Sequence, residues 1–182
     1  MNTTTVVIIV LVIAALIVEA ALIWFFTRRR RTEQLRTRFG PEYDHTVRQL
    51  GSQTKAEDAL AARQKHMETI PIHPLTPQVR ERFAGRWHDV QARFVDDPAG
   101  SIQDADSLVK DAMQARGYPM GEFEQRAEDL SVDHPKVVQN YRAAHAIAIR
   151  RERGEATTED LRHALVYYRD LFEELLELHG VR

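Results

Sequence analysis

The chain has 182 residues, of which 43% are hydrophobic and 29% are charged, and its formal net charge is -2. These values fit a folded domain with an appendage and exclude an intrinsically disordered chain. The sequence contains no cysteine, which excludes a disulfide framework, a thiol nucleophile and a thiolate metal site.

The first element is an apolar segment, residues 6–26, with Glu19 as its single charge. A helix of this length spans roughly 31 Å, close to the hydrocarbon thickness of a bilayer, so residues 1–27 are predicted to be a transmembrane anchor. The alternative is a cleaved signal peptide, because VEA before Ala21 resembles a small-residue cleavage site. The opening MNTTT has no basic residue and the apolar run is long for a signal peptide, and both features favour the anchor.

Glu19 is an unusual residue within this apolar segment. A charge near the centre of a membrane helix is unfavourable by about 2.5–3.5 kcal/mol. Ala15 lies one turn earlier on the same face, which places a small residue beside a polar one. The pair indicates either association with another membrane helix, including a second copy of this chain, or a tolerated lone glutamate.

A basic juxtamembrane segment is predicted over residues 28–40, beginning with Arg28, Arg29, Arg30 and Arg31. The excess of arginine on this side predicts an N-terminus outside and a cytoplasmic C-terminal domain. We expect the four arginines to contact anionic lipid, each contributing about 1 kcal/mol. Residues 39–182 have a net charge of -6, which is not the basic surface that a nucleic-acid partner requires.

The rest of the chain is predicted to be helical, because proline and glycine divide it into segments with helical periodicity and no segment alternates like a strand. The predicted fold class is all-α: one N-terminal transmembrane helix followed by a soluble bundle of about five to six helices. Residues 41–70 are predicted to be a polar stalk and residues 71–182 the bundle. The stalk helix covers roughly residues 42–68, has a thin apolar stripe, and contains Gly51-Ser52, where it is able to bend. The segment FGPEYD before it is either a functional motif or a hinge.

Three of the later helices have clear starting signals. Thr76-Pro77 and Asp97-Pro98 each place an N-cap residue before a proline, and Thr157 faces Asp160 in an arrangement like a capping box. The helices are expected over residues 77–95, 98–116, 122–130 and 135–153, and from Thr157 to about His179.

The stretch DLSVDHPKVVQNYRAAH, residues 129–145, contains many residue types that are found in active sites. We interpret it instead as a helix that starts near His134 with Asp133 or Ser131 as its N-cap. Tyr141 and His145 then lie on the apolar face, and they form a candidate buried polar site.

The spacing of the histidines indicates no local metal site. His134 and His145 are about 16 Å apart along one helix, too far to share an ion. No two of the eight histidines are three or four residues apart, and no motif for nucleotides or zinc is present. No catalytic, metal-binding or cofactor-binding residue is predicted, and we expect a protein that is not an enzyme.

At LRTRFGPEYDHTVRQLGSQTKAE, ARFVDDPAGSIQDADSLVKDAMQARGYP and FEQRAEDLSVDHPKVVQNYRAAHAI the chain resembles a family of bacterial membrane-anchored or secreted all-helical proteins of unknown function. The resemblance covers most of residues 30–175. It implies a helical body behind an N-terminal apolar segment in the bacterial inner membrane, and no activity, cofactor or catalytic residue.

The leading expectation is a single-pass membrane protein whose helical module binds another protein or a second copy of itself. The first alternative is a small-ligand or stress-sensing module with a pocket around Trp87, Tyr141 and His145. The second alternative is a secreted or envelope helical protein, if the apolar segment is cleaved.

Overall fold

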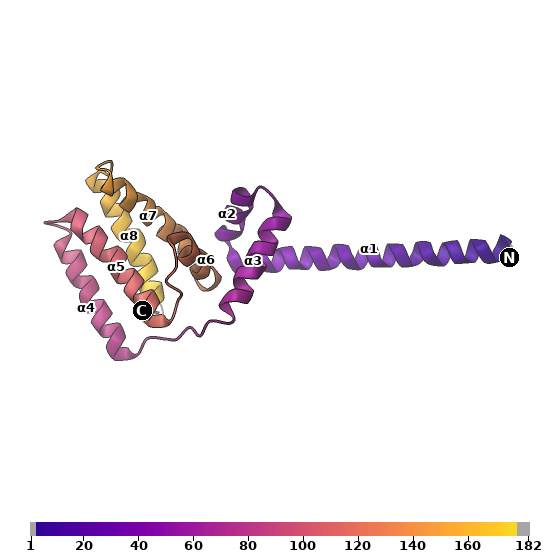
Figure 1. The fold of residues 1–182 in the computed structure, drawn as a ribbon, viewed down its shortest axis with the longest axis horizontal. Coiled ribbons are helices and arrows are strands. Elements are labelled where there is room, and N and C mark those ends of the chain that lie inside the picture. The colour runs from indigo at the N-terminus through magenta and orange to yellow at the C-terminus, as the bar shows by residue number, and fades with distance from the viewer. Residues whose placement is uncertain (1–2, 178–182) are drawn as a thin grey trace. The chain divides into compact units, whose positions relative to one another are not determined.

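A computed structural model describes residues 3–177, without the side chains of residues 3–11, 14 and 15. All regular structure in this part of the chain is helical, so the predicted all-α class is confirmed. The helices are α1 (Thr3–Phe39), α2 (Pro41–Leu50), α3 (Gln53–Met67), α4 (Pro77–Arg93), α5 (Pro98–Arg116), α6 (Phe123–Asp133), α7 (Val138–Glu152) and α8 (Thr158–Leu175) (Figure 1). The chain divides into two compact units, Met1–Arg38 and Phe39–Arg182.

The core of the second unit lies where α8 packs against both α5 and α7 (Figure 1). Six apolar residues of α5 are buried there: Ile102, Ala105, Leu108, Val109, Ala112 and Met113. On α8, Tyr168, Leu171, Phe172 and Leu175 are buried as well. Burying one large apolar side chain contributes about 1.5–3 kcal/mol, which makes this three-helix contact the main source of stability.

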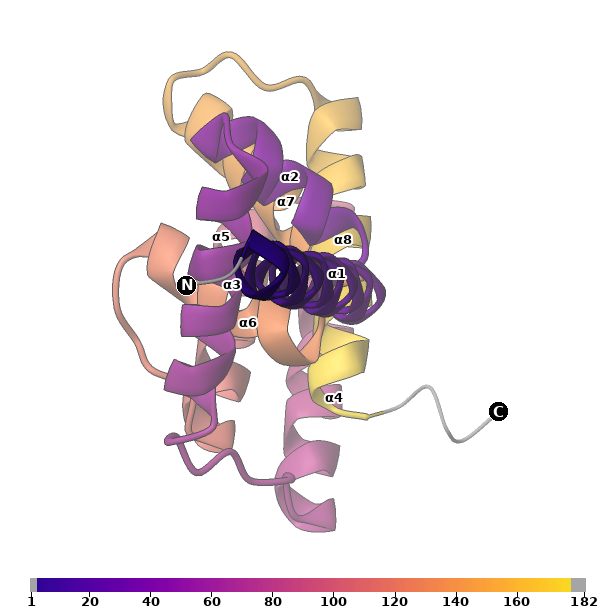
Figure 2. The same ribbon diagram turned by 90° about the vertical axis from the view of Figure 1, so that its right-hand side faces the viewer.

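Helix α4 adds a further layer of contacts to this core. Helix α4 packs along α5, and its Trp87 stacks on Phe172 of α8 with ring centroids 4.8 Å apart. The loop after α7 carries the chain back to the start of α8, so these two helices run antiparallel (Figure 2).

The predicted start signals for α4, α5 and α8 are confirmed. The hydroxyl of Thr76 accepts a hydrogen bond from the Val79 amide, and the Asp97 carboxylate accepts one from the Gly100 amide at 2.9 Å. Thr157 and Asp160 form a complete capping box at the start of α8. Helix α8 ends at Leu175, earlier than predicted, and the predicted end at His179 lies outside the described residues.

The prediction of one stalk helix over residues 42–68 is wrong, because this segment folds into the two helices α2 and α3. Gly51 ends α2 in the left-handed conformation at φ 63°, and the Ser52 hydroxyl caps α3. A left-handed glycine followed by an N-cap residue both stops one helix and starts the next. The two helices form a hairpin that packs on α6 and α7 within the unit Phe39–Arg182, and Tyr43 and Leu60 are buried there.

The predicted start of the helix after Asp133 is also wrong. Helix α6 continues through Asp133, and α7 begins only at Val138 and has no side-chain cap. Pro135 explains the difference, because the residue before a proline is disfavoured in the helical region, and His134 accordingly adopts φ -127° and ψ 54°. Ser131 is buried inside α6, and Asp133 accepts a hydrogen bond from the Tyr118 hydroxyl at 2.9 Å instead of capping a helix.

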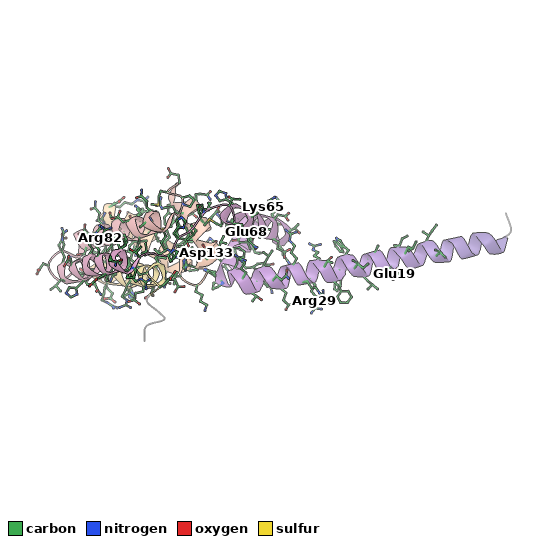
Figure 3. All side chains as sticks on the ribbon, turned by 90° about the horizontal axis from the view of Figure 1, so that it is seen from below. Glu19, Arg29, Lys65, Glu68, Arg82 and Asp133 are labelled. Atoms are coloured by element: carbon green, nitrogen blue, oxygen red, sulfur yellow. The ribbon has the colours of Figure 1, made fainter. Side chains whose placement is uncertain are left out.

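Helix α1 carries the predicted anchor. Among the described residues, no helix contains an apolar run long enough to cross a membrane, so the structure gives no support to the transmembrane assignment. The side chains of residues 6–11, 14 and 15, which belong to the predicted span, are outside the described set. Glu19 and Arg29 are exposed on this helix (Figure 3).

Candidate functional site

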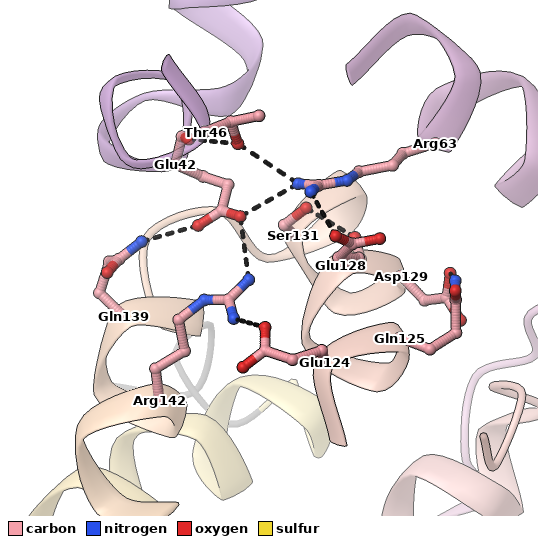
Figure 4. A network of polar contacts seen from close by, with 10 residues as sticks. All are labelled: Glu42, Thr46, Arg63, Glu124, Gln125, Glu128, Asp129, Ser131, Gln139 and Arg142. Carbon is pink, nitrogen blue, oxygen red and sulfur yellow. Dashed lines mark hydrogen bonds and ion pairs between the residues drawn. The ribbon is translucent and has the colours of Figure 1, made fainter. Parts of the chain in front are cut away.

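A network of buried charged and polar side chains joins the α2–α3 hairpin to α6 and α7 (Figure 4). Its centre is Glu42, which lies in the first turn of α2 and has no exposed surface. Gly40, at φ 47°, and Pro41, at the first helical position, start α2 so that Glu42 is carried directly toward α7. The segment FGPEYD is therefore a structural element that holds the hairpin in place.

Three donors from two other helices surround the Glu42 carboxylate. Arg63 of α3 and Arg142 of α7 each donate to Oε1 at 3.1 Å, and Gln139 of α7 donates to Oε2 at 2.7 Å. Hydrogen bonds between ionised partners are roughly twice as strong as neutral ones, and they compensate for removing this carboxylate from water.

Both arginines have a second acidic partner on α6. Arg63, whose side chain is 8% exposed, donates to Glu128 at 2.6 Å and also contacts the Thr46 hydroxyl at 3.4 Å. Arg142 pairs with Glu124. The network thus connects four helices, and its contacts fix how the hairpin packs against the bundle.

A second buried contact lies within the hairpin itself. The Tyr43 hydroxyl donates to Glu57 Oε1 at 2.9 Å, and Gln53 donates to the same oxygen at 2.8 Å. Tyr43 and Glu57 are only 1% and 3% exposed. The hairpin is therefore internally rigid as well as fixed to its neighbours.

The candidate polar site at Tyr141 and His145 is a packed aromatic cluster. Phe123 of α6 stacks on His145 with centroids 3.6 Å apart and also contacts the ring of Tyr141. Burial lowers the pKa of His145, which favours its neutral form, and the side chain is half-buried as predicted. Tyr141 packs edge-on against Tyr168, whose hydroxyl donates to Asp106 at 3.1 Å.

Trp87, the third residue of the predicted pocket, packs elsewhere in the unit. Its ring stacks on Phe172, so it belongs to the α4–α8 contact. Tyr141 and Tyr168 have no exposed surface, and Trp87 therefore does not share one aromatic cluster with Tyr141 and His145.

The His134 side chain is only 10% exposed. Its Nδ1 lies 3.3 Å from Glu174 Oε1 on α8, and its Nε2 is buried without a hydrogen-bond partner. Burial lowers its pKa, an effect that Glu174 opposes. His134 lies at the end of α6, whereas His145 lies on α7, so the two histidines do not share one helix as predicted.

The proposed membrane residues lie in the first unit. Trp24, Phe25 and Phe26 are each more than half exposed, and the Arg28 guanidinium lies 5.2 Å from the centre of the Trp24 ring. Arg29, Arg30 and Arg31 are exposed on the following turn. Glu19 is exposed, whereas the side chain of Ala15 lies outside the described residues.

Two hollows lie on the surface of the second unit. One, of about 310 Å³ between α4 and α5, contains Arg93, which is bonded to Asp97 and Asp104 at 2.7 Å each. The other, of about 340 Å³, lies between the hairpin and α6 and includes Asp129. In the part of the chain that the structure describes, no group of three or more histidine and acidic residues is placed to hold a metal ion.

Four residues of this network were not predicted from the sequence: Glu42, Arg63, Gln139 and Arg142. One local signal was present: Ala56, Leu60, Arg63 and Met67 recur at the spacing of one helical face, and all four are buried. An arginine at an apolar-face position indicates a buried acidic partner, but the spacing does not identify which one.

No family model, curated protein sequence or solved structure matches this chain.

Proposed function

We propose that this chain is a non-enzymatic, single-pass membrane protein whose helical unit Phe39–Arg182 binds another protein. The observation that carries the proposal is the run of exposed apolar side chains on α1, which is followed directly by four arginines. A helix that is apolar on all sides is typical of a membrane span or of the interior of a large assembly.

Between Val12 and Phe26, the apolar side chains that the structure describes have high exposed fractions. They are 59% for Leu16, 63% for Ile17 and 65% for Ile23, and the run continues to Phe26. Each square ångström of apolar surface left in water costs about 25 cal/mol, so an apolar environment around this helix is strongly favoured. Together with residues 6–11 the run reaches bilayer length in the sequence.

The boundary residues support an orientation. Aromatic side chains such as Trp24 favour the headgroup level, and Arg28 to Arg31 follow on the side that the positive-inside rule assigns to the cytoplasm. In a bacterial inner membrane the N-terminus would lie outside, and the arginines would contact anionic headgroups.

The partner-binding role rests on the charge of the second unit. Residues 39–182 have a net charge of -6, and such a surface favours partners with a basic surface and speeds their association. We expect contacts that weaken as salt concentration rises.

Extraction of membranes at alkaline pH tests the anchor. The intact chain should remain in the membrane pellet, and the double substitution Leu16→Arg and Ile23→Arg should release most of it to the supernatant. Val95→Arg is the matched control, because Val95 is 83% exposed but lies in the second unit. Release of the intact chain, or equal retention of all three proteins, would contradict the anchor.

Affinity capture of the full chain from native membranes, after cross-linking, tests the partner. A reproducible protein with a basic surface, recovered at low salt and reduced at high salt, is the expected result. Recovery of no reproducible protein would argue against an interaction module and for a small-ligand function.

A further inference from the structure

The hollow between the α2–α3 hairpin and α6 has an apolar side and an acidic side. Leu50, Ala59 and Ala62 line the first, and Glu128 and Asp129 line the second. Its volume is about 340 Å³, which accommodates a side chain or a small organic molecule. All its walls belong to the unit Phe39–Arg182.

Asp129 is buried, but only one of its two carboxylate oxygens has a hydrogen-bond partner. The residue is 1% exposed, and its Oδ1 accepts a hydrogen bond from Gln125 at 2.8 Å, whereas its Oδ2 is buried with no hydrogen-bond partner. A buried acceptor without a donor is unfavourable, and a carboxylate is more so than a neutral group. A donor that reached Oδ2 through the hollow would remove this penalty.

The charge around the hollow is not balanced by the chain itself. The lining contains two carboxylates, those of Glu128 and Asp129, and one guanidinium group, that of Arg63. Arg63 already donates to Glu42, Thr46 and Glu128 (Figure 4). His66 is the other basic residue in the lining, and it is exposed. Burial raises the pKa of Asp129, and the charge of His66 lowers it by less.

We propose that this hollow binds an organic cation with a short apolar stem, an alkylguanidinium or alkylammonium group, which donates to Asp129 while its methylene groups contact Leu50, Ala59 and Ala62. Such a group is carried either by an arginine or lysine side chain of a partner protein or by a free amine. The site does not require the membrane anchor, so its test is independent of the proposed location.

Calorimetric titration of the full chain in zwitterionic detergent with butylguanidinium chloride tests the site. Saturable binding is expected, and it should weaken at least tenfold in Asp129→Asn, a change that keeps the size of the side chain. Glu124→Gln is the matched control, because Glu124 is on the same helix but outside the lining, and it should bind like the parent. Absence of saturable binding, or equal binding by Asp129→Asn, would overturn the proposal.

Two further measurements separate charge from shape. Butylurea, which is neutral, should bind at least tenfold more weakly than butylguanidinium, and equal binding would also overturn the proposal. Ala62→Leu fills the hollow from an exposed position and should weaken binding without altering charge or folding, as followed by circular dichroism. Unchanged binding by this variant places the cation elsewhere and contradicts the assignment.

The source of the cation follows from a comparison of ligands. A five-residue alanine peptide with one central arginine should bind more tightly than butylguanidinium if the natural ligand is a protein side chain. Equal or weaker binding of the peptide assigns the site to a free cation, and both results support the cation site itself.

Discussion

Two glutamates show how differently the two units of this chain treat charge and apolar surface. Glu19 lies on α1, exposed among exposed apolar side chains, whereas Glu42 lies on α2 with no exposed surface and three donors around it. The unit Phe39–Arg182 buries its apolar residues and neutralises its central charge. On α1, by contrast, the described apolar side chains between Val12 and Phe26 are exposed, and we propose that a membrane surrounds them.

The largest effect is expected from Glu42→Ala. This change leaves the nearly buried Arg63 and Arg142 without their shared partner, and it should lower the free energy of unfolding by about 3–5 kcal/mol. Urea unfolding of the full chain in detergent provides the measurement.

Glu124→Ala is the control for this change. Glu124 also pairs with Arg142, but its side chain is 63% exposed, so the expected loss is about 0–1 kcal/mol. Equal losses in the two variants would mean that the network does not hold the hairpin.

A smaller effect is expected from Glu19→Leu. The unfolding free energy of the unit Phe39–Arg182 should not change, because Glu19 is on α1. If Glu19 pairs with another membrane helix, self-association or partner capture should fall by about 1 kcal/mol, a factor of roughly five. Unchanged association in membranes would identify Glu19 as a tolerated lone charge.

The smallest expected effect is a dependence of the unfolding free energy of the unit Phe39–Arg182 on pH. Because burial lowers the pKa of His134 below its ordinary value of 6.5, the unfolded chain takes up a proton more readily than the folded one. Stability should therefore fall as the pH drops below about 6.5, and His145 contributes in the same direction. Asp129 acts with the opposite sign, since burial raises its pKa and stability falls as the pH rises above 3.8.

His134→Gln should make the fall in stability below neutral pH shallower. The exposed His163 provides the control, and His163→Gln should leave the fall in place. Thermal unfolding between about pH 5 and 8 measures both, and an unchanged slope in His134→Gln would show that its burial has no energetic consequence.

The parts of the fold that were predicted from sequence depend on short-range signals. Caps and helical periodicity are read within a few residues, and they located α4, α5 and α8 with their starting residues. The sequence indicated a bend at Gly51-Ser52. Because the apolar stripe of this segment is thin, however, one polar stalk helix was predicted instead of a packed hairpin. Pro135 was interpreted as the start of a helix, whereas in the structure it follows the end of one.

The polar network was not predictable in the same way, because its partners are far apart in the chain. Gln139 and Arg142 reach Glu42 across separations of 97 and 100 residues. Arg63 lies on the same helical face as Leu60 and Met67, but this spacing gives no information on which carboxylate meets it. The unpartnered oxygen of Asp129 likewise depends on the packing of three helices, α2, α3 and α6.

We propose that α1 anchors the chain in a membrane with the unit Phe39–Arg182 on the cytoplasmic side. Protease treatment of sealed inner-membrane vesicles tests this arrangement. The unit should stay with the vesicles, be protected when they are right side out, and be digested when they are inverted. Digestion in right-side-out vesicles, or loss of the chain from the vesicles before protease is added, would contradict it.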